Sequence, residues 1–174
     1  MIPGVASDIS GLSARHSPSG ASSLDRCDLG TEQIMFLAGT TGGSATRSCT
    51  TNKTVFLVPL INVECSTAEG NGTTFAELST CAKGFADDFS HLKLRVDGQA
   101  IGNLQSLRVQ AQSTFTSVKG NVFGIPKAKD TQFAADGYWA LITLTPGTHT
   151  LTFGGSYPPG GFTTEVTYNL LITN

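Results

Sequence analysis

Residues 135–174 read ADGYWALITLTPGTHTLTFGGSYPPGGFTTEVTYNLLITN, and this stretch decides the fold. It predicts three β-strands, at 138–145, 148–153 and 162–172, because β-branched and aromatic residues are frequent in each of them. Pro146-Gly147 supplies a tight turn between the first two strands, and a Gly/Pro-rich loop separates the last two. We therefore expect the centre of an antiparallel sheet here.

Shorter patterns upstream predict further strands and one helix. The expected strands lie at 32–39, 45–50, 54–64, 91–97 and 104–118. We expect 45–50 to pair back on 32–39 across a glycine-rich turn. Asp97-Gly98 is a strong hairpin signal. Thr74 and Glu77 form an S/T-x-x-E capping box, which predicts a helix that begins at Thr74. Residues 121–132, with Pro126 and three charges, are expected to form a loop.

The order of these elements indicates the fold class. The chain has about nine or ten expected strands, turn signals about every 8–12 residues, and no alternation of strands with helices. We predict an all-β protein, a two-sheet antiparallel β-sandwich of jelly-roll-like type with one short helix. Residues 1–26 are rich in Ser, Gly and Ala without apolar periodicity, so we expect an N-terminal arm or tail, followed by a sandwich domain at 27–174.

Composition excludes several classes of protein. Only 14% of the 174 residues are charged, and the 11 basic and 13 acidic residues give a net charge of -2, so nothing favours binding to nucleic acid. The longest apolar run, 55–63, is far shorter than the roughly 20 residues that cross a bilayer, so we expect no membrane span. The abundance of Gly, Ser and Thr is typical of an extracellular all-β protein.

Four cysteines point to the compartment. Cys27, Cys49, Cys65 and Cys81 lack the CxxC spacing of a zinc site, and an even number in a chain of this composition favours two disulfides. Of the three possible pairings we favour Cys27–Cys49 with Cys65–Cys81; the alternative is four buried thiols. The first residues carry no leader pattern. We therefore expect a secreted or cell-surface protein whose leader is absent from this chain.

Three segments resemble a family of uncharacterised bacterial exported proteins. The segments are IMFLAGTTGGSATRSCT, VFLVPLINVEC and the closing DGYW…PGTHT…F…TY pattern, and the resemblance that they carry runs from about residue 34 to residue 174. The family pattern has an FLAGT-like strand and a Cys-Thr followed by an apolar strand that reaches Asn-x-Glu-Cys. Where the family has a Pro-Ala-x-Lys turn after the Cys-Thr, this chain has Thr51-Asn52-Lys53. The resemblance implies export and a β-sandwich, and it carries no catalytic residues.

Three side chains in the closing segment are candidates for function. His149 shares the inward face of its strand with Leu151 and Phe153, where it either acts as a base for a nucleophile such as Ser156 or hydrogen-bonds a turn at the sandwich rim. Trp139 and Tyr157 either pack in the core or present a ring to a sugar or a partner.

Carboxylates offer weaker candidates. The Asp87-Asp88 pair with Asp97, or Asp130 with Asp136, lacks the D-x-D-x-D spacing of a calcium loop. Glu64 and Glu77 are the nearest approach to a glycosidase pair, although their spacing does not favour one. We expect no metal and no cofactor.

These observations favour an extracellular, non-catalytic structural or adhesive protein. Its expected partner is itself, through the N-terminal arm or exposed sheet edges, or a surface glycan. The alternatives are a carbohydrate-binding module that uses Tyr157 and Trp139, and a hydrolase or lyase that uses His149.

Overall fold

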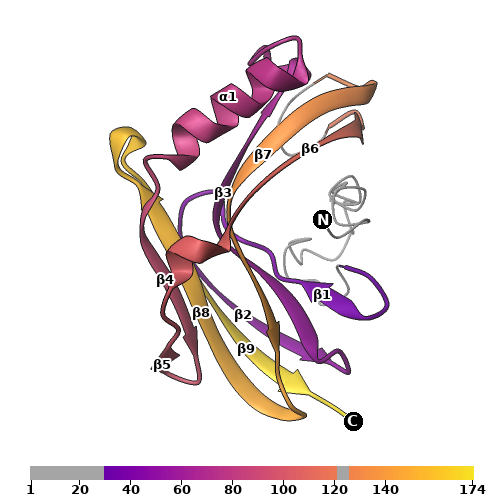
Figure 1. Ribbon diagram of the computed structural model, residues 1–174. Helices are drawn as coiled ribbons and strands as arrows, with labels where there is room; N and C mark the ends of the chain where they lie inside the picture. The colour runs from indigo at the N-terminus through magenta and orange to yellow at the C-terminus, as the bar shows by residue number, and fades with distance from the viewer. Residues whose placement is uncertain (1–29, 121–125) are drawn as a thin grey trace. The chain divides into compact units, whose positions relative to one another are not determined.

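The computed structural model describes residues 30–120 and 126–174 (Figure 1). The expected arm at 1–26 and Cys27 lie outside the described residues. The described chain divides into two compact units. The larger one, here the sandwich unit, comprises 30–62, 88–109 and 137–174. The smaller one, here the helix unit, comprises 63–87, 110–120 and 126–136.

Nine strands, one α-helix and three short 3-10 turns make up the described chain. In order they are β1 (Ile34–Phe36), β2 (Gly43–Thr51), β3 (Val55–Ser66), η3 (Thr67–Glu69), α1 (Phe75–Ala86), β4 (Ser90–Val96), β5 (Gln99–Ala100), η4 (Leu104–Leu107), β6 (Arg108–Ser117), β7 (Ala128–Thr143), β8 (Gly147–Tyr157), η5 (Pro158–Gly160) and β9 (Phe162–Ile172).

The strands form two sheets, of order β1-β3-β7-β6 and β2-β9-β8-β4-β5. The expected all-β sandwich with one helix is confirmed. Both sheets are mixed, however, because β1 runs parallel to β3 and β2 runs parallel to β9. The prediction that 45–50 pairs with 32–39 is therefore wrong. The two segments enter different sheets, so the glycine-rich turn between them crosses from one layer to the other.

Strand boundaries differ from the sequence prediction at the start of β7. We expected a loop at 121–132, but β7 already begins at Ala128. The charged residues Lys127, Lys129 and Asp130 led to the loop prediction, because charged residues are uncommon in strands. Lys129 and Asp130 are exposed in β7, where a charge costs little. The strand β8 also runs beyond the expected Phe153, to Tyr157.

The core of the sandwich unit lies between its two sheets. Antiparallel pairing of β8 with β9 continues without a break from Gly147↔Ile172 to Tyr157↔Phe162. Alternation along this ladder buries one side chain in two, as the sequence predicts for β9. Fully buried members of the core are Phe56, Val58 and Leu60 from β3 and Leu151, Phe153, Val166, Tyr168 and Leu170 from β8 and β9. The rings of Phe153 and Tyr168 stack with centroids 6.1 Å apart.

A buried arginine ties β2 to the segment after β1. Arg47 is only 7% exposed, and its guanidinium donates hydrogen bonds to the carbonyl oxygens of Ala38 (2.8 Å) and Gly39 (3.0 Å). It also lies over the ring of Tyr168, 5.6 Å from the ring centroid. The Tyr168 hydroxyl accepts from the backbone N–H of Ala38 at 3.0 Å. A charge buried in this way is tolerated because several acceptors and a π-face surround it.

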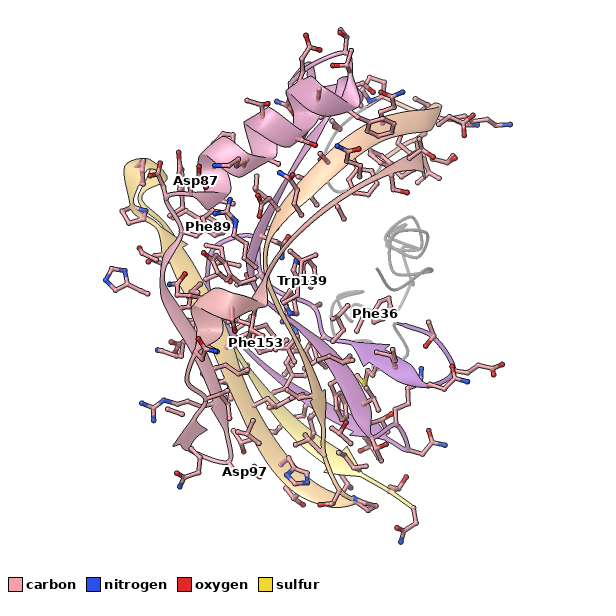
Figure 2. The ribbon with its side chains drawn as sticks, in the orientation of Figure 1. Phe36, Asp87, Phe89, Asp97, Trp139 and Phe153 are labelled. Carbon is pink, nitrogen blue, oxygen red and sulfur yellow. A yellow bond between two sulfur atoms is a disulfide. The ribbon has the colours of Figure 1, made fainter. Side chains whose placement is uncertain are left out.

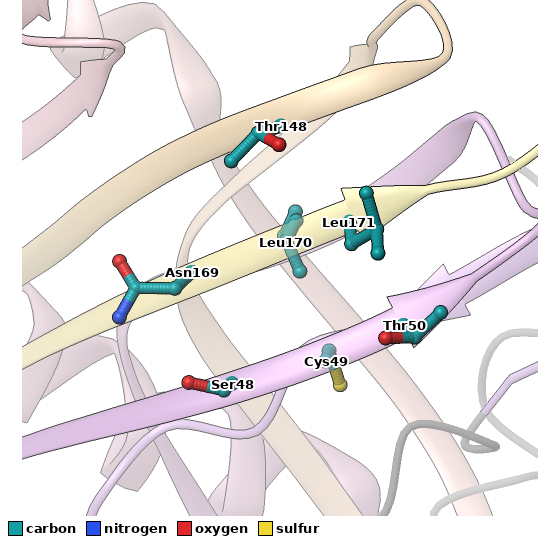
Figure 3. A pocket seen from close by; sticks show the side chains of 7 residues that line it. All are labelled: Ser48, Cys49, Thr50, Thr148, Asn169, Leu170 and Leu171. Atoms are coloured by element: carbon teal, nitrogen blue, oxygen red, sulfur yellow. The ribbon is translucent and has the colours of Figure 1, made fainter.

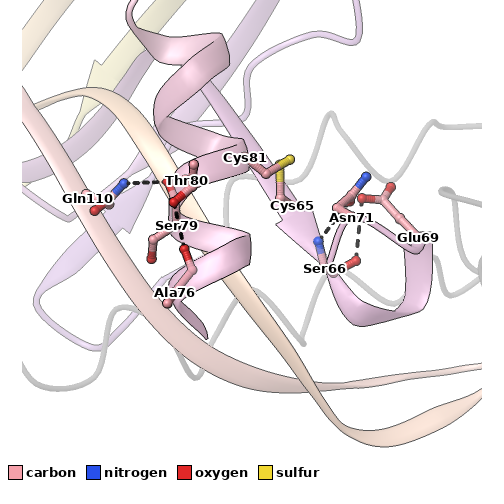
Figure 4. The surroundings of a disulfide bond; sticks show 9 residues. All are labelled: Cys65, Ser66, Glu69, Asn71, Ala76, Ser79, Thr80, Cys81 and Gln110. Carbon is pink, nitrogen blue, oxygen red and sulfur yellow. Dashed lines mark hydrogen bonds between the residues drawn. A yellow bond between two sulfur atoms is a disulfide. The ribbon is translucent and has the colours of Figure 1, made fainter. Parts of the chain in front are cut away.

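The helix unit is built around α1 and one disulfide. The capping box is confirmed: Thr74 caps the helix by accepting from the Glu77 N–H, and the Glu77 carboxylate accepts from the Thr74 N–H. Leu78 and Ala82 pack on Cys65 and Ala134, and the predicted Cys65–Cys81 disulfide joins α1 to β3 (Figure 4). Cys49 also forms a disulfide. None of the described helices is long and apolar enough to span a membrane.

One glycine makes a close approach between β7 and β3 possible. A Cβ atom at Gly137 would lie 2.5 Å from the Cα atom of Asn62 and 2.5 Å from the carbonyl oxygen of Ile61. We expect Gly137→Ala to lower the free energy of unfolding by about 1–3 kcal/mol, because the two strands must separate. The matched control is Gly39→Ala, where a Cβ meets nothing within 4 Å. Urea unfolding of both variants is the measurement, and equal midpoints would contradict the expectation.

Candidate functional site

Side chains that point away from the core of the five-stranded sheet form a polar surface, here the hydroxyl face. Its residues come from four neighbouring strands and are mostly Ser, Thr, Asn or charged. They are Ser44, Thr46, Ser48 and Thr50 on β2; Glu165, Thr167, Asn169 and Leu171 on β9; Thr148, Thr150 and Thr152 on β8; and Lys93 and Arg95 on β4.

The strand register aligns these side chains in rows. Thr46 lies beside Thr167, Thr167 beside Thr152, and Thr152 beside Arg95. The hydroxyl oxygens of Thr152 and Thr167 are 3.1 Å apart, within hydrogen-bond distance. Neighbouring strands are about 4.8 Å apart and alternate residues about 6.7 Å apart, so the rows form a regular grid. The hydroxyl face thus offers donors and acceptors at repeated spacings.

Two shallow hollows lie on the hydroxyl face. The first has a volume of about 250 Å³ and is lined by Ser48, Thr50, Thr148, Asn169 and Leu171 with the chain at Cys49 and Leu170 (Figure 3). Leu171 is 46% exposed and adds an apolar patch between the polar side chains. A ligand in this hollow would meet hydroxyl and amide groups around one apolar contact.

The second hollow, of about 620 Å³, lies at the other end of the same face. Gly154 and Gly155 line it, and Gly154 allows a close approach of β8 to β9, because a Cβ there would lie 2.0 Å from the carbonyl oxygen of Thr164. Lys93 and Glu165 line the hollow on either side and form an ion pair, with about half of each side chain exposed. An exposed pair of this kind contributes little to stability, so exchanging it for contacts with a ligand costs little.

A β-bulge at the edge of the second hollow turns His91 toward Ser156. The register of β4 on β8 shifts between Ser90 and Lys93, and His91 has the left-handed φ of 50°. The His91 Nδ1 atom lies 2.8 Å from the Ser156 Oγ atom, while that hydroxyl also donates to the Ser90 carbonyl oxygen at 3.2 Å. Bulges commonly redirect a side chain in this way. The sequence paired Ser156 with His149; the structure pairs it with His91.

A serine hydrolase would need more than this pair. The base must be oriented by a third group, and among the residues that the structure describes no acceptor bonds the Nε2 atom of His91. Ser156 is only 7% exposed. Its single proton already has the Ser90 carbonyl as an acceptor, so His91 can act as the donor to Ser156. His91, Ser156 and Ser90 therefore form a hydrogen-bonded rim of the second hollow.

His149 lies at the rim of the sandwich unit, where it bonds to two acceptors. Its Nδ1 atom is 2.8 Å from the Asp97 carboxylate and its Nε2 atom is 3.0 Å from the Thr145 carbonyl oxygen. The hydrogen bond to Asp97 raises the pKa of His149, opposed by burial and assisted by the Thr145 carbonyl. The Thr150 N–H, followed by His149, lowers the pKa of Asp97. Both ring nitrogens face acceptors, so the protonated ring satisfies both contacts and in that state has no lone pair with which to act as a base.

The two aromatic candidates do not meet at one site. Tyr138 is buried and donates to Gln105 at 3.0 Å, so Trp139 points to the opposite side of β7, where it is half-buried (Figure 2). Tyr157 ends β8 on the other sheet and packs edge-on against Phe89, with ring centroids 6.1 Å apart. His149 and Tyr157 are separated along β8 by about 26 Å. Trp139 and Tyr157, the two rings expected in a carbohydrate site, thus lie on strands of different sheets.

Two carboxylates of the helix unit, Glu77 and Glu64, have different surroundings. Glu77 belongs to the capping box, and hydrogen bonds from Thr73 and Thr74 lower its pKa. Burial, and then the neighbouring charge of Glu69, raises the pKa of Glu64 to about 8. Its Oε2 atom is buried and has no hydrogen-bond partner among the described residues. Glu64 and Glu77 therefore do not form the acid pair of a glycosidase.

Within residues 30–120 and 126–174, no three His, Cys, Asp or Glu side chains lie close enough together to hold a metal ion. The hydroxyl face itself was missed from the sequence, because alternate threonines are ordinary on the outside of any strand. The register that aligns them is a non-local property. Only the Gly154-Gly155 pair within the strand pattern was a local signal for the hollow.

Comparisons with protein-family models, with curated proteins and with solved structures found no significant match. The resemblance of the FLAGT, Asn-x-Glu-Cys and DGYW…PGTHT segments to bacterial exported proteins stays a prediction.

The His149–Asp97 pair makes stability depend on pH. A raised pKa of His149 stabilises the fold fully below the ordinary value of 6.5, and this contribution is lost as pH rises through the folded-state pKa. A lowered pKa of Asp97 stabilises above its ordinary 3.8 and is lost as pH falls through the folded-state pKa. We expect His149→Gln to lower the free energy of unfolding by about 1 kcal/mol near pH 5, and by less above pH 8. Urea unfolding at both pH values is the measurement; a loss that grows with pH would disprove this assignment.

The buried carboxyl of Glu64 destabilises the fold at high pH. Because its pKa is raised from 4.5 to about 8, the folded state retains a proton that the unfolded state releases, and stability falls as pH rises between these values. We expect Glu64→Gln to raise the free energy of unfolding at pH 8 by about 1–2 kcal/mol, with little effect at pH 4. The exposed Glu32 provides the control variant, Glu32→Gln. An unchanged pH profile in Glu64→Gln would show that the buried carboxyl is not the source.

Proposed function

We propose that this chain is an extracellular, non-catalytic adhesive domain that binds a polyhydroxylated surface, such as a glycan, through its hydroxyl face. The observation that carries the proposal is the in-register array of hydroxyl, amide and charged side chains on β2, β9, β8 and β4, with two hollows on the same face.

The chemistry of the hydroxyl face matches that of a sugar. A sugar hydroxyl both donates and accepts hydrogen bonds, and so do the Thr hydroxyls and the Asn169 amide. Buried hydroxyls are costly unless they are hydrogen-bonded, so a ligand rich in hydroxyls needs a surface rich in partners. Thr167 and Asn169 provide such partners side by side along β9, and Leu171 offers an apolar contact for a ring face.

The extracellular part of the proposal is supported by the disulfides. Cys65–Cys81 joins α1 to β3, and Cys49 is disulfide-bonded as well. Disulfides persist in oxidising compartments and are rare in the cytosol. The low charge and the many Ser, Thr and Gly residues agree with this location.

The non-catalytic part rests on the state of the two best-placed imidazoles. Both nitrogens of His149 are engaged, with the Asp97 carboxylate and with the Thr145 carbonyl oxygen, so neither faces a substrate. His91 contacts Ser156, whose proton has the Ser90 carbonyl as an acceptor. Neither histidine combines a free lone pair, an orienting acid and an accessible nucleophile, which nucleophilic catalysis requires.

The proposal is tested by retention of the protein on insoluble polysaccharides and on a glycan array. We expect the intact chain to bind at least one glycan, and the double variant Lys93→Ala/Glu165→Ala to bind it at least about tenfold more weakly, because both side chains line the larger hollow. The double change leaves the net charge at -2.

The chain offers a matched control. Lys83 of α1 and Asp87, the residue that follows α1, form an exposed ion pair, and Lys83→Ala/Asp87→Ala removes the same two kinds of charge from side chains that do not belong to the hydroxyl face. This control should bind as the intact chain does. Absence of binding by the intact chain to every glycan tested, or equal binding by the two double variants, would refute the proposal.

A further inference from the structure

The last strand of the four-stranded sheet has an unusually open edge. β6 pairs with β7 on one side, and in the part of the chain that the structure describes no strand pairs with its other side. It is ten residues long and exposed along most of its length. The stretch from Gln110 to Gln112 is exposed at every position. From Val109 to Ser117, such an edge presents a row of backbone donors and acceptors to which another strand can add.

This edge lacks the devices by which natural sheets prevent strand pairing. Residues 109–118, VQAQSTFTSV, contain no charged side chain and no proline. Thr, Val and Phe in this segment favour extended chain. Of the other edge strands, β1 has three residues and β5 has two, while β2 has nine and carries the inward-pointing charge of Arg47. An edge is normally protected by Lys, Pro, a bulge or short length.

The helix unit keeps this edge in place without covering it. The Gln110 amide donates to the Ser79 carbonyl oxygen at 3.0 Å (Figure 4). The Gln112 amide donates to the Ser79 hydroxyl at 2.6 Å. At the far end, Ser117 bonds the backbone of Ala128 on β7. These contacts anchor β6 at Gln110, Gln112 and Ser117, so the strand is ordered before any partner arrives. Preorganisation of this kind lowers the entropy cost of binding.

We propose that β6 pairs with β6 of a second copy of this chain, in antiparallel orientation about a two-fold axis. A two-fold axis perpendicular to the sheet, beside the middle of β6 and between the two copies, produces antiparallel pairing automatically, and two-fold dimers are the commonest symmetric assemblies. The four-stranded sheets of the two copies then continue as one sheet.

A second copy is the partner that the composition of β6 favours. Like charges opposite each other oppose self-pairing, and this strand has none between Arg108 and Lys119. Its Gln, Ser and Thr side chains both donate and accept, so identical strands satisfy each other. A charged peptide would gain no ion pair from this edge. One added strand pair buries a small area, which places the dimer among weak, concentration-dependent associations.

The experiment measures the molar mass of the full chain by light scattering after gel filtration, at about 10 μM to about 1 mM. We expect the mass to rise from 18.1 kDa toward twice that value as the concentration increases. The variant Ala111→Lys/Thr114→Lys places charges on two exposed positions of the edge. It should weaken the dimer at least about tenfold.

The control adds the same charge to the edge of the other sheet. Gln99→Lys/Ala100→Lys lies on β5, where both residues are exposed, and should leave the dimer unchanged. Thermal unfolding of each variant checks the fold, and Thr116→Lys is a milder change at a third exposed position. A monomer at every concentration, or a dimer that survives the Lys variants of β6, overturns the proposal. Glycan binding plays no part in the readout, so this result is independent of the proposed function.

Discussion

The register of β8 on β9 is the constraint on which the sandwich unit depends. Eleven consecutive pairs, from Gly147↔Ile172 to Tyr157↔Phe162, leave no freedom in which side chains point inward. A shift by one residue would send Leu151, Phe153 and Val166 to water and bring threonines into the core. The two strands therefore determine the apolar interior and the polar exterior in one step. β2 then pairs with β9 and β4 with β8, on a sheet whose inward and outward faces are already determined.

The hydroxyl face follows from this constraint as directly as the core does. Its threonines line up because the buried side chains between them are in register. The packing of the interior therefore also fixes the backbone positions of the surface residues. The two departures from regularity both concern the larger hollow: Gly154 removes a side chain, and the bulge after Ser90 turns His91. A binding surface built on a central sheet requires little ordering of side chains when a ligand arrives.

Features that depend on neighbours in sequence could be predicted, and features that depend on distant strands could not. The Thr74 capping box, the Asp97-Gly98 hairpin and the Cys65–Cys81 disulfide each lie within a short segment, and all three agree with the structure. The rim position of His149 also followed from alternation. Parallel pairing of β2 with β9 joins segments more than 100 residues apart, and no local pattern encodes it. The contact of His91 with Ser156 depends on a bulge and a left-handed φ, which alternation does not reveal.

Parallel pairing of β2 with β9 also determines how the sandwich unit resists mechanical force. The nine paired residues from Gly43↔Thr164 to Thr51↔Ile172 run in the same direction. Tension applied to the start of β2 and to the end of β9 is directed along the strands, so it loads every backbone hydrogen bond of this pair in shear. An antiparallel hairpin pulled at its two ends opens one bond at a time instead. The strand arrangement thus gives a protein held between two surfaces a mechanical clamp at its carboxyl-terminal strand.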